Sequence, residues 1–95
     1  MTTPEARRWR YLEKKYGITK GRYNVLLKQQ HGRCAICHRP PKKRRLSVDH
    51  DHKTGRIRGL LCYKCNYGLG FFGYNPETLV SLTIYLEPYF NVVNR

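Results

Sequence analysis

The sequence predicts a small α+β fold, in which a β-hairpin and the helix after it are braced by zinc and flanked by helices at both ends of the chain. Two observations predict this fold. Two Cys-x-x-Cys pairs, at Cys34/Cys37 and Cys62/Cys65, enclose two short stretches with strand-like composition. Amphipathic stretches with helix-capping residues lie on either side of this unit.

The 95 residues are predicted to form a single domain with three parts. These parts are a basic helical segment (1–32), the zinc-braced core (33–73), and a C-terminal helix with its tail (74–95). A chain of this length buries a modest hydrophobic core, so a metal staple is expected to contribute to its stability.

Two helices are predicted in the N-terminal segment, over 4–16 and 20–30. Thr3 and Thr19 stand at the capping positions, and Gly17 ends the first helix. Each helix carries apolar residues at helical spacing, which are expected to face the core: Trp9, Leu12 and Tyr16 on the first, and Tyr23, Leu26 and Leu27 on the second.

The zinc-braced core is predicted to begin with a hairpin. Its strands span 46–49 and 56–61, and a turn at 53–55 joins them. A helix is expected from Cys62 to about Phe72, with the second cysteine pair in its first turn.

A last helix is predicted over 76–87, because Asn75 and Pro76 suit its start and Pro88 ends it. The tail that follows, 89–95, is expected to be loose. Leucines on this helix are spaced as a core stripe, and apolar tail residues are candidates for packing on a partner chain: Leu79, Leu82 and Leu86, and then Tyr89, Phe90, Val92 and Val93.

The cysteine spacing predicts a four-thiolate zinc site, which is closed and structural because no position is left for water. Two disulfides are the alternative. The N-terminus lacks the apolar segment of a secretory signal, which favours a reducing, intracellular compartment and opposes disulfides. His38 is a further candidate ligand, but all four thiols are available.

The chain is strongly basic, with 19 Lys and Arg against 6 Asp and Glu and a formal charge of +13. Such a charge predicts DNA or RNA as the partner, because neutralising phosphates releases condensed counterions. A membrane partner is disfavoured, since no apolar run can span a bilayer and no helix pairs a basic face with a strongly apolar one. The predicted phosphate contacts, each with a solvated surface as its alternative, are Arg7, Arg8, Arg10, Lys42, Lys43, Arg44, Arg45, Arg56 and Arg58.

An acidic-histidine cluster lies at the end of the first predicted strand. Asp49 and Asn66 offer the carboxylate and amide oxygens that suit a hard cation such as Mg²⁺ or Mn²⁺. Zinc binding is expected to bring Asn66, which directly follows the last cysteine, near this cluster. His50 is then the candidate that deprotonates water, and His52 is the candidate contact to the scissile phosphate.

Three points about this cluster stay open. Asp51 is expected to pair with a nearby Lys or Arg. Asn66 has the alternative role of supporting the helix after the cysteines. Asp49 and His50 point to opposite faces of a regular strand, so the strand must bend or end there if both serve one site.

The pair Cys34-Ala-Ile-Cys37 and the run from Val48 to Asn66 closely resemble the phage recombination endonuclease VII family. That family belongs to the HNH, or His-Me finger (ββα-metal), nucleases. The resemblance covers about residues 16–87. It implies a hairpin followed by a helix, with zinc as a brace.

The resemblance also implies a role for each matching residue. His50 matches the general base and His52 a histidine that assists at the phosphate. Asp49 and Asn66 match the ligands of the catalytic divalent metal, and the four cysteines match the structural zinc ligands. The best-known junction-resolving member is longer and builds an intertwined dimer. The acidic residues that assist in that member have no clear match after Asn66 in this chain. Whether this chain resolves DNA junctions therefore stays open.

The leading hypothesis is a metal-dependent DNA endonuclease that nicks with low sequence specificity, with branched DNA as a further substrate class. One site cuts one strand, so double-strand cleavage needs a homodimer rather than a monomer. A phage origin would place the protein in the cytoplasm of a bacterial host. The alternatives are a non-catalytic zinc-finger module that binds nucleic acid, and a structural subunit of a phage assembly.

Overall fold

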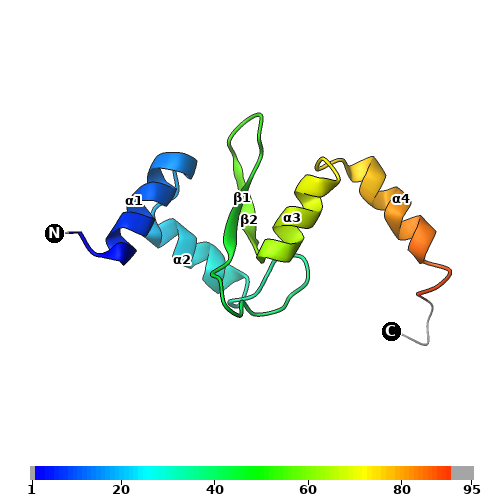
Figure 1. The fold of residues 1–95 in the computed structure, drawn as a ribbon, viewed down its shortest axis with the longest axis horizontal. Helices are drawn as coiled ribbons and strands as arrows, with labels where there is room; N and C mark the ends of the chain where they lie inside the picture. Colours follow the sequence, from blue (N-terminus) through cyan, green and yellow to red (C-terminus); the bar gives the residue numbers. More distant parts are fainter. Residues whose placement is uncertain (1, 91–95) are drawn as a thin grey trace.

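The computed structural model describes residues 2–90 and has an α+β fold with a central hairpin. Helices α1 and α2 lie on one side of the hairpin, and α3 lies on the other (Figure 1). None of the helices within this range combines the length and apolarity of a membrane span. The elements are α1 (Pro4–Tyr16), α2 (Lys20–Gln29), β1 (Ser47–His50), β2 (Ile57–Leu61), α3 (Tyr63–Phe71) and α4 (Pro76–Leu86).

Helices α1, α2 and α4 begin at the residues that the capping pattern predicted, and their ends lie within one residue of the predicted ones. The side-chain oxygens of Thr3 and Thr19 accept backbone N–H groups at 3.0 and 3.1 Å at the starts of α1 and α2. Asn75 does the same for α4 at 2.9 Å. Gly17 ends α1 with φ at 70°, a left-handed conformation that glycine adopts without steric cost.

A small core joins the N-terminal helices to the hairpin. The hydroxyl of Tyr23 donates a hydrogen bond to the carbonyl oxygen of Leu46 at 2.6 Å, which ties α2 to the entry of β1. Trp9 and Tyr16 pack against this core, as predicted for their stripe. The buried apolar residues are Leu12, Ile18, Tyr23, Cys34, Leu46, Val48, Leu60 and Leu61.

The hairpin has a bulge beside the acidic-histidine cluster. Asp49 lies opposite Gly59, whereas His50 lies opposite Ile57, so Arg58 is an extra residue on β2. A bulge of this kind bends the strand and redirects side chains. The pairing of the two strands is therefore irregular beside Asp49 and His50, but the extra residue lies on β2, and the bend required of β1 for both side chains to serve one site stays a prediction.

Helix α4 does not pack as predicted. It contributes no buried residue, Leu79 and Leu82 are only half-buried, and Leu86 is 53% exposed. The cause is the turn before it, where Gly73 and Tyr74 have φ values of 68° and 57° and direct α4 away from the core (Figure 1).

The radius of gyration agrees with a helix α4 that projects from the core. The radius of gyration is 15.9 Å, against about 12 Å for a compact domain of this length. Of the tail residues proposed for partner contact, Tyr89 and Phe90 are exposed. Val92 and Val93 lie outside the described residues.

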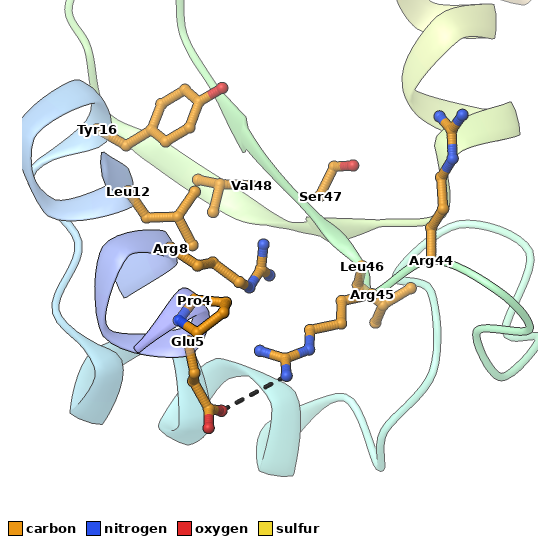
Figure 2. Close-up of a pocket in the computed structure, with 10 residues that line it drawn as sticks. All are labelled: Pro4, Glu5, Arg8, Leu12, Tyr16, Arg44, Arg45, Leu46, Ser47 and Val48. Atoms are coloured by element: carbon orange, nitrogen blue, oxygen red, sulfur yellow. Dashed lines mark hydrogen bonds and ion pairs between the residues drawn. The ribbon is translucent and has the colours of Figure 1, made fainter. Parts of the chain in front are cut away.

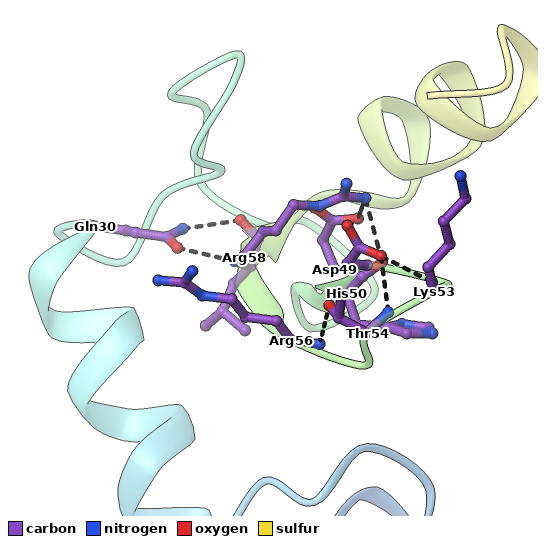
Figure 3. Close-up of polar contacts among 9 residues, drawn as sticks. Gln30, Asp49, His50, Lys53, Thr54, Arg56 and Arg58 are labelled. Atoms are coloured by element: carbon purple, nitrogen blue, oxygen red, sulfur yellow. Dashed lines mark hydrogen bonds and ion pairs between the residues drawn. The ribbon is translucent and has the colours of Figure 1, made fainter. Parts of the chain in front are cut away.

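The free edge of β2 is covered at Leu60 by the side chain of Gln30 and by the backbone N–H of Ala35, which donates to the Leu60 carbonyl oxygen at 3.1 Å. The amide of Gln30, directly after α2, donates to the carbonyl oxygen of Leu60 and accepts its N–H, both at 2.9 Å (Figure 3). It also donates to the carbonyl oxygen of Arg33 at 2.8 Å. The side-chain amide of Gln30 therefore makes the pair of hydrogen bonds that a neighbouring strand would make. It joins α2, the first cysteine loop and the hairpin.

Replacing Gln30 with Ala is expected to lower the free energy of unfolding by about 1–3 kcal/mol, because the buried N–H of Leu60 loses its acceptor. Denaturant titration measures this change. The matched control is Gln29→Ala, one residue earlier on the exposed surface of α2. Equal stability of the two variants would contradict the role given to Gln30.

Candidate metal centre and active site

The four cysteines form one compact cluster. Cys34 and Cys37 come from the loop after α2, Cys62 caps α3, and Cys65 lies in its first turn. All four sulfur atoms lie within 4.8 Å of one another. The Cys37 and Cys62 sulfurs are 3.9 Å apart, near the spacing of about 3.8 Å that tetrahedral zinc–thiolate bonds of about 2.3 Å produce.

These thiols are free, and their ionisation is coupled. Burial disfavours the Cys34 thiolate, but backbone hydrogen bonds from Cys37, Cys62 and Ile36 outweigh burial and lower the pKa of Cys34 to about 6. Burial and hydrogen bonds with the neighbouring thiols raise the pKa of Cys65 to about 12. One thiolate thus opposes ionisation of the next, and a cation is needed to hold all four in the ionised form.

The cluster is therefore positioned to bind a metal ion, and its four soft donors favour zinc in a closed structural site. Its position explains its structural importance. It connects the loop after α2 to the first turn of α3, and α3 packs against both strands of the hairpin. The metal would consequently fix the helix that carries Asn66 against the strand that carries Asp49.

The histidines predicted for catalysis lie together at the end of β1. The ring centroids of His50 and His52 are 4.6 Å apart. Tyr16 of α1 lies 5.0 Å from His50, and Tyr74, between α3 and α4, lies 4.7 Å from His52. The four rings form a row that holds both imidazoles in place, and neither tyrosine was predicted as a site residue.

Asp51 shapes the loop that carries His52. Its carboxylate accepts the backbone N–H groups of Lys53 and Thr54 at 2.8 and 3.0 Å (Figure 3). These bonds, led by that from Thr54, lower the pKa of Asp51 below its ordinary value. The predicted ion pair with a Lys or Arg side chain is wrong, because the carboxylate is engaged by the backbone of its own turn.

Asp49 is buried, at 6% exposure, and is held by Arg58. The guanidinium donates to its two oxygens at 2.8 and 3.0 Å and to the carbonyl oxygen of His50 at 3.2 Å (Figure 3). The hydrogen bond with Asp49 raises the pKa of Arg58. Arg58 also lies over the ring of Tyr74 at 5.2 Å, which connects the carboxylate to the row of rings.

Asn66 lies in α3 directly after Cys65 and is half-buried. Among residues 2–90, the acidic-histidine motif makes no further cluster of three or more His, Cys, Asp or Glu ligands. An Asp and an Asn are nevertheless a suitable donor set for Mg²⁺, which keeps several of its waters. A carboxylate that accepts a bidentate arginine also retains lone pairs for a cation.

The predicted phosphate contacts differ in their environment. Arg8 is half-buried, and its guanidinium lies over the rings of Trp9 and Tyr23. Arg45 forms an ion pair with Glu5 at 3.4 Å, and Arg44 lies over Tyr63. Arg58 binds Asp49, as described above. The other predicted phosphate contacts are exposed: Arg7, Arg10, Lys42, Lys43 and Arg56.

Replacing Cys34 with Ser is expected to unfold the core, because metal binding and folding are coupled in closed thiolate sites. Thermal melting by circular dichroism, with bound zinc measured in parallel, tests this expectation. Ala35→Ser introduces the same residue at the adjacent exposed position and should leave both readouts unchanged. A Cys34→Ser chain that melts like the unsubstituted one would exclude a structural metal.

Replacing Arg58 with Gln is expected to lower the free energy of unfolding by about 1–2 kcal/mol, because a buried carboxylate loses its partner. Solvent at the half-exposed arginine moderates the loss. Denaturant titration without added divalent metal is the measurement. Arg56→Gln, on the exposed part of the same hairpin, should have no comparable effect, and equal losses would refute the role assigned to Arg58.

Comparison with known proteins identifies relatives of this chain. The "Gene 59 protein" of Mycobacterium phage L5 is 60% identical over 58 residues, and that of Mycobacterium phage D29 is 59% identical over the same length. Each match covers 59% of this chain and 35% of the relative, so the chain spans about a third of those proteins. No solved structure matches. The family model for recombination endonuclease VII matches residues 9–88, and the chain belongs to that family.

Proposed function

We propose that the protein is a metal-dependent DNA endonuclease of the HNH, or His-Me finger, type. The observation that carries the proposal is the cluster at the hairpin bulge, where the rings of His50 and His52 lie 4.6 Å apart and the neighbouring Asp49 is buried. The order β1, β2, α3 supports the type, because a ββα-metal core has this order. Membership of the endonuclease VII family supports the nuclease activity.

In the proposed reaction His50 acts as the general base. Its imidazole accepts a proton from a water molecule, whose oxygen attacks the phosphorus of the phosphodiester. The bond from phosphorus to the leaving oxygen then breaks, and that oxygen takes up a proton from solvent. Tyr16 and His52 lie against the imidazole of His50, and the proposed role of the exposed His52 is to donate to a phosphate oxygen.

Asp49 and Asn66 are the residues proposed to hold Mg²⁺ or Mn²⁺. When bound, such a cation neutralises charge on the phosphate and the leaving oxygen. The zinc-binding cysteines support this arrangement indirectly, because Asn66 directly follows Cys65 and α3 packs against β1. Asp49 would exchange part of its contact with Arg58 for the cation.

The proposed substrate is DNA, double-stranded or branched, and the proposed product is a nick. The chain offers many cations and few groups suited to reading base edges, so low sequence specificity is expected. A protomer carries one proposed site, which cuts one strand, whether it acts as a monomer or in a homodimer. The matched phage proteins favour action in the cytoplasm of a bacterial host.

His50→Asn is expected to reduce the nicking of supercoiled plasmid with Mg²⁺ or Mn²⁺ by about 10²–10⁴-fold, because the general base is lost. DNA binding and bound zinc should be retained. The control is His31→Asn at the exposed end of α2, where φ is 56° and asparagine is well tolerated.

The outcomes separate the hypotheses. Nicking that survives His50→Asn would remove His50 from the mechanism. Absence of nicking by the unsubstituted chain with either metal, while it still binds DNA, would favour the non-catalytic zinc-finger module.

A further inference from the structure

A groove of about 670 Å³ runs between α1 and the strand β1 (Figure 2). Leu12 and Val48 contribute apolar surface to it, and the side chains of Arg8 and Arg45 point into it. Its size is within the range of about 300–1,000 Å³ that is usual for small-ligand sites. The groove lies outside the cluster at the bulge, so the proposed reaction leaves it without a role.

The groove has an excess of positive charge. Two guanidinium groups, those of Arg8 and Arg45, face it together with the single carboxylate of Glu5, whereas the guanidinium of Arg44 points away and lies over Tyr63 (Figure 2). That carboxylate pairs with Arg45 in an exposed contact of 3.4 Å, which contributes little energy. The unbalanced cations favour an anionic occupant.

Arg8 carries the clearest sign of an absent partner. Its Nε is buried and has no hydrogen-bond acceptor among the residues that the structure describes. Its guanidinium is held over the rings of Trp9 and Tyr23, at 5.3 and 5.8 Å, so it is a fixed group rather than a freely moving one. An unsatisfied buried donor is costly, and it shows that the described residues leave part of the hydrogen-bonding capacity of Arg8 unused.

Tyr16 connects the groove to the proposed active site. It lines the groove, and its ring lies 5.0 Å from that of His50. An occupant of the groove would thus lie next to a phosphate placed at His50. Proteins bind unpaired nucleotides with cations, which contact the phosphates, and with aromatic rings, on which the free bases stack. The arginines and Tyr16 supply both kinds of group here. Duplex DNA keeps its bases stacked internally and would use only the cations.

We propose that this groove binds one unpaired nucleotide of the DNA strand that is cut, adjacent to the scissile phosphate. Its own phosphate lies at Arg8 and Arg45, and its base lies against Tyr16, the half-buried aromatic side chain that lines the groove. The inference rests on the proposed function, because it assigns the flank of the same site. It gives the protein a preference for cleavage where the strand beside the cut is unpaired.

The test is the equilibrium binding of a fluorescein-labelled single-stranded oligodeoxythymidylate and of a duplex of equal length, measured by anisotropy without added divalent metal. Arg45→Gln removes one cation, and Ser47→Tyr fills the groove from β1 without changing the charge. Each is expected to weaken single-strand affinity about tenfold, in the range of a lost base contact. Duplex affinity should change far less for Ser47→Tyr. The control Arg22→Gln, on the exposed surface of α2, removes the same charge outside the groove.

Bound zinc and melting temperature verify that the variants are folded. Single-strand affinity that falls equally in Arg45→Gln and Arg22→Gln and is unchanged in Ser47→Tyr would overturn the proposal. Equal losses for single strand and duplex in Ser47→Tyr would also overturn it and assign the groove to the duplex backbone. These readouts need no cleavage, so a chain that fails to nick but shows the expected losses refutes only the proposed function.

Discussion

The contact among four sulfur atoms is the constraint on which the rest of the structure depends. The sheet has only two strands, and a hairpin of that size is marginal in water by itself. The cluster of Cys34, Cys37, Cys62 and Cys65 joins the loop after α2 to the start of α3, so that helices lie on both sides of the hairpin. Gln30 then completes the free edge of β2 from the same loop.

The bulge at Arg58 converts this scaffold into a site. In a regular ladder Asp49 and His50 would face opposite sides of the hairpin. The extra residue, Arg58, lies on β2 and its guanidinium binds Asp49, while the rings of His50 and His52 lie 4.6 Å apart. The result is a buried carboxylate and two imidazoles near one another, each held by neighbours from other elements. In the proposed function, these neighbours would hold the catalytic groups in fixed positions.

Much of this arrangement was predictable from local chemistry. The caps at Thr3, Thr19 and Asn75, and the spacing of the cysteines, act over a few residues and are legible in the sequence. The aromatic partners Tyr16 and Tyr74 were not predicted, because they meet the histidines only through tertiary packing. The leucines of α4 have core spacing, yet that helix projects from the core because of two left-handed residues at Gly73 and Tyr74. Asparagine and aspartate tolerate that conformation better than tyrosine, so the turn carries no strong local signal at Tyr74.

We propose that one scaffold holds two different metal ions, zinc among the four thiolates and a hard cation beside His50, the proposed general base. Crystals grown with Mn²⁺ and measured by anomalous scattering at the zinc and manganese edges test it directly. The account predicts a zinc peak among the four cysteine sulfurs and a separate manganese peak between the Asp49 carboxylate and the Asn66 amide. A manganese peak confined to the cysteines, or none near Asp49 while zinc is bound, would contradict it.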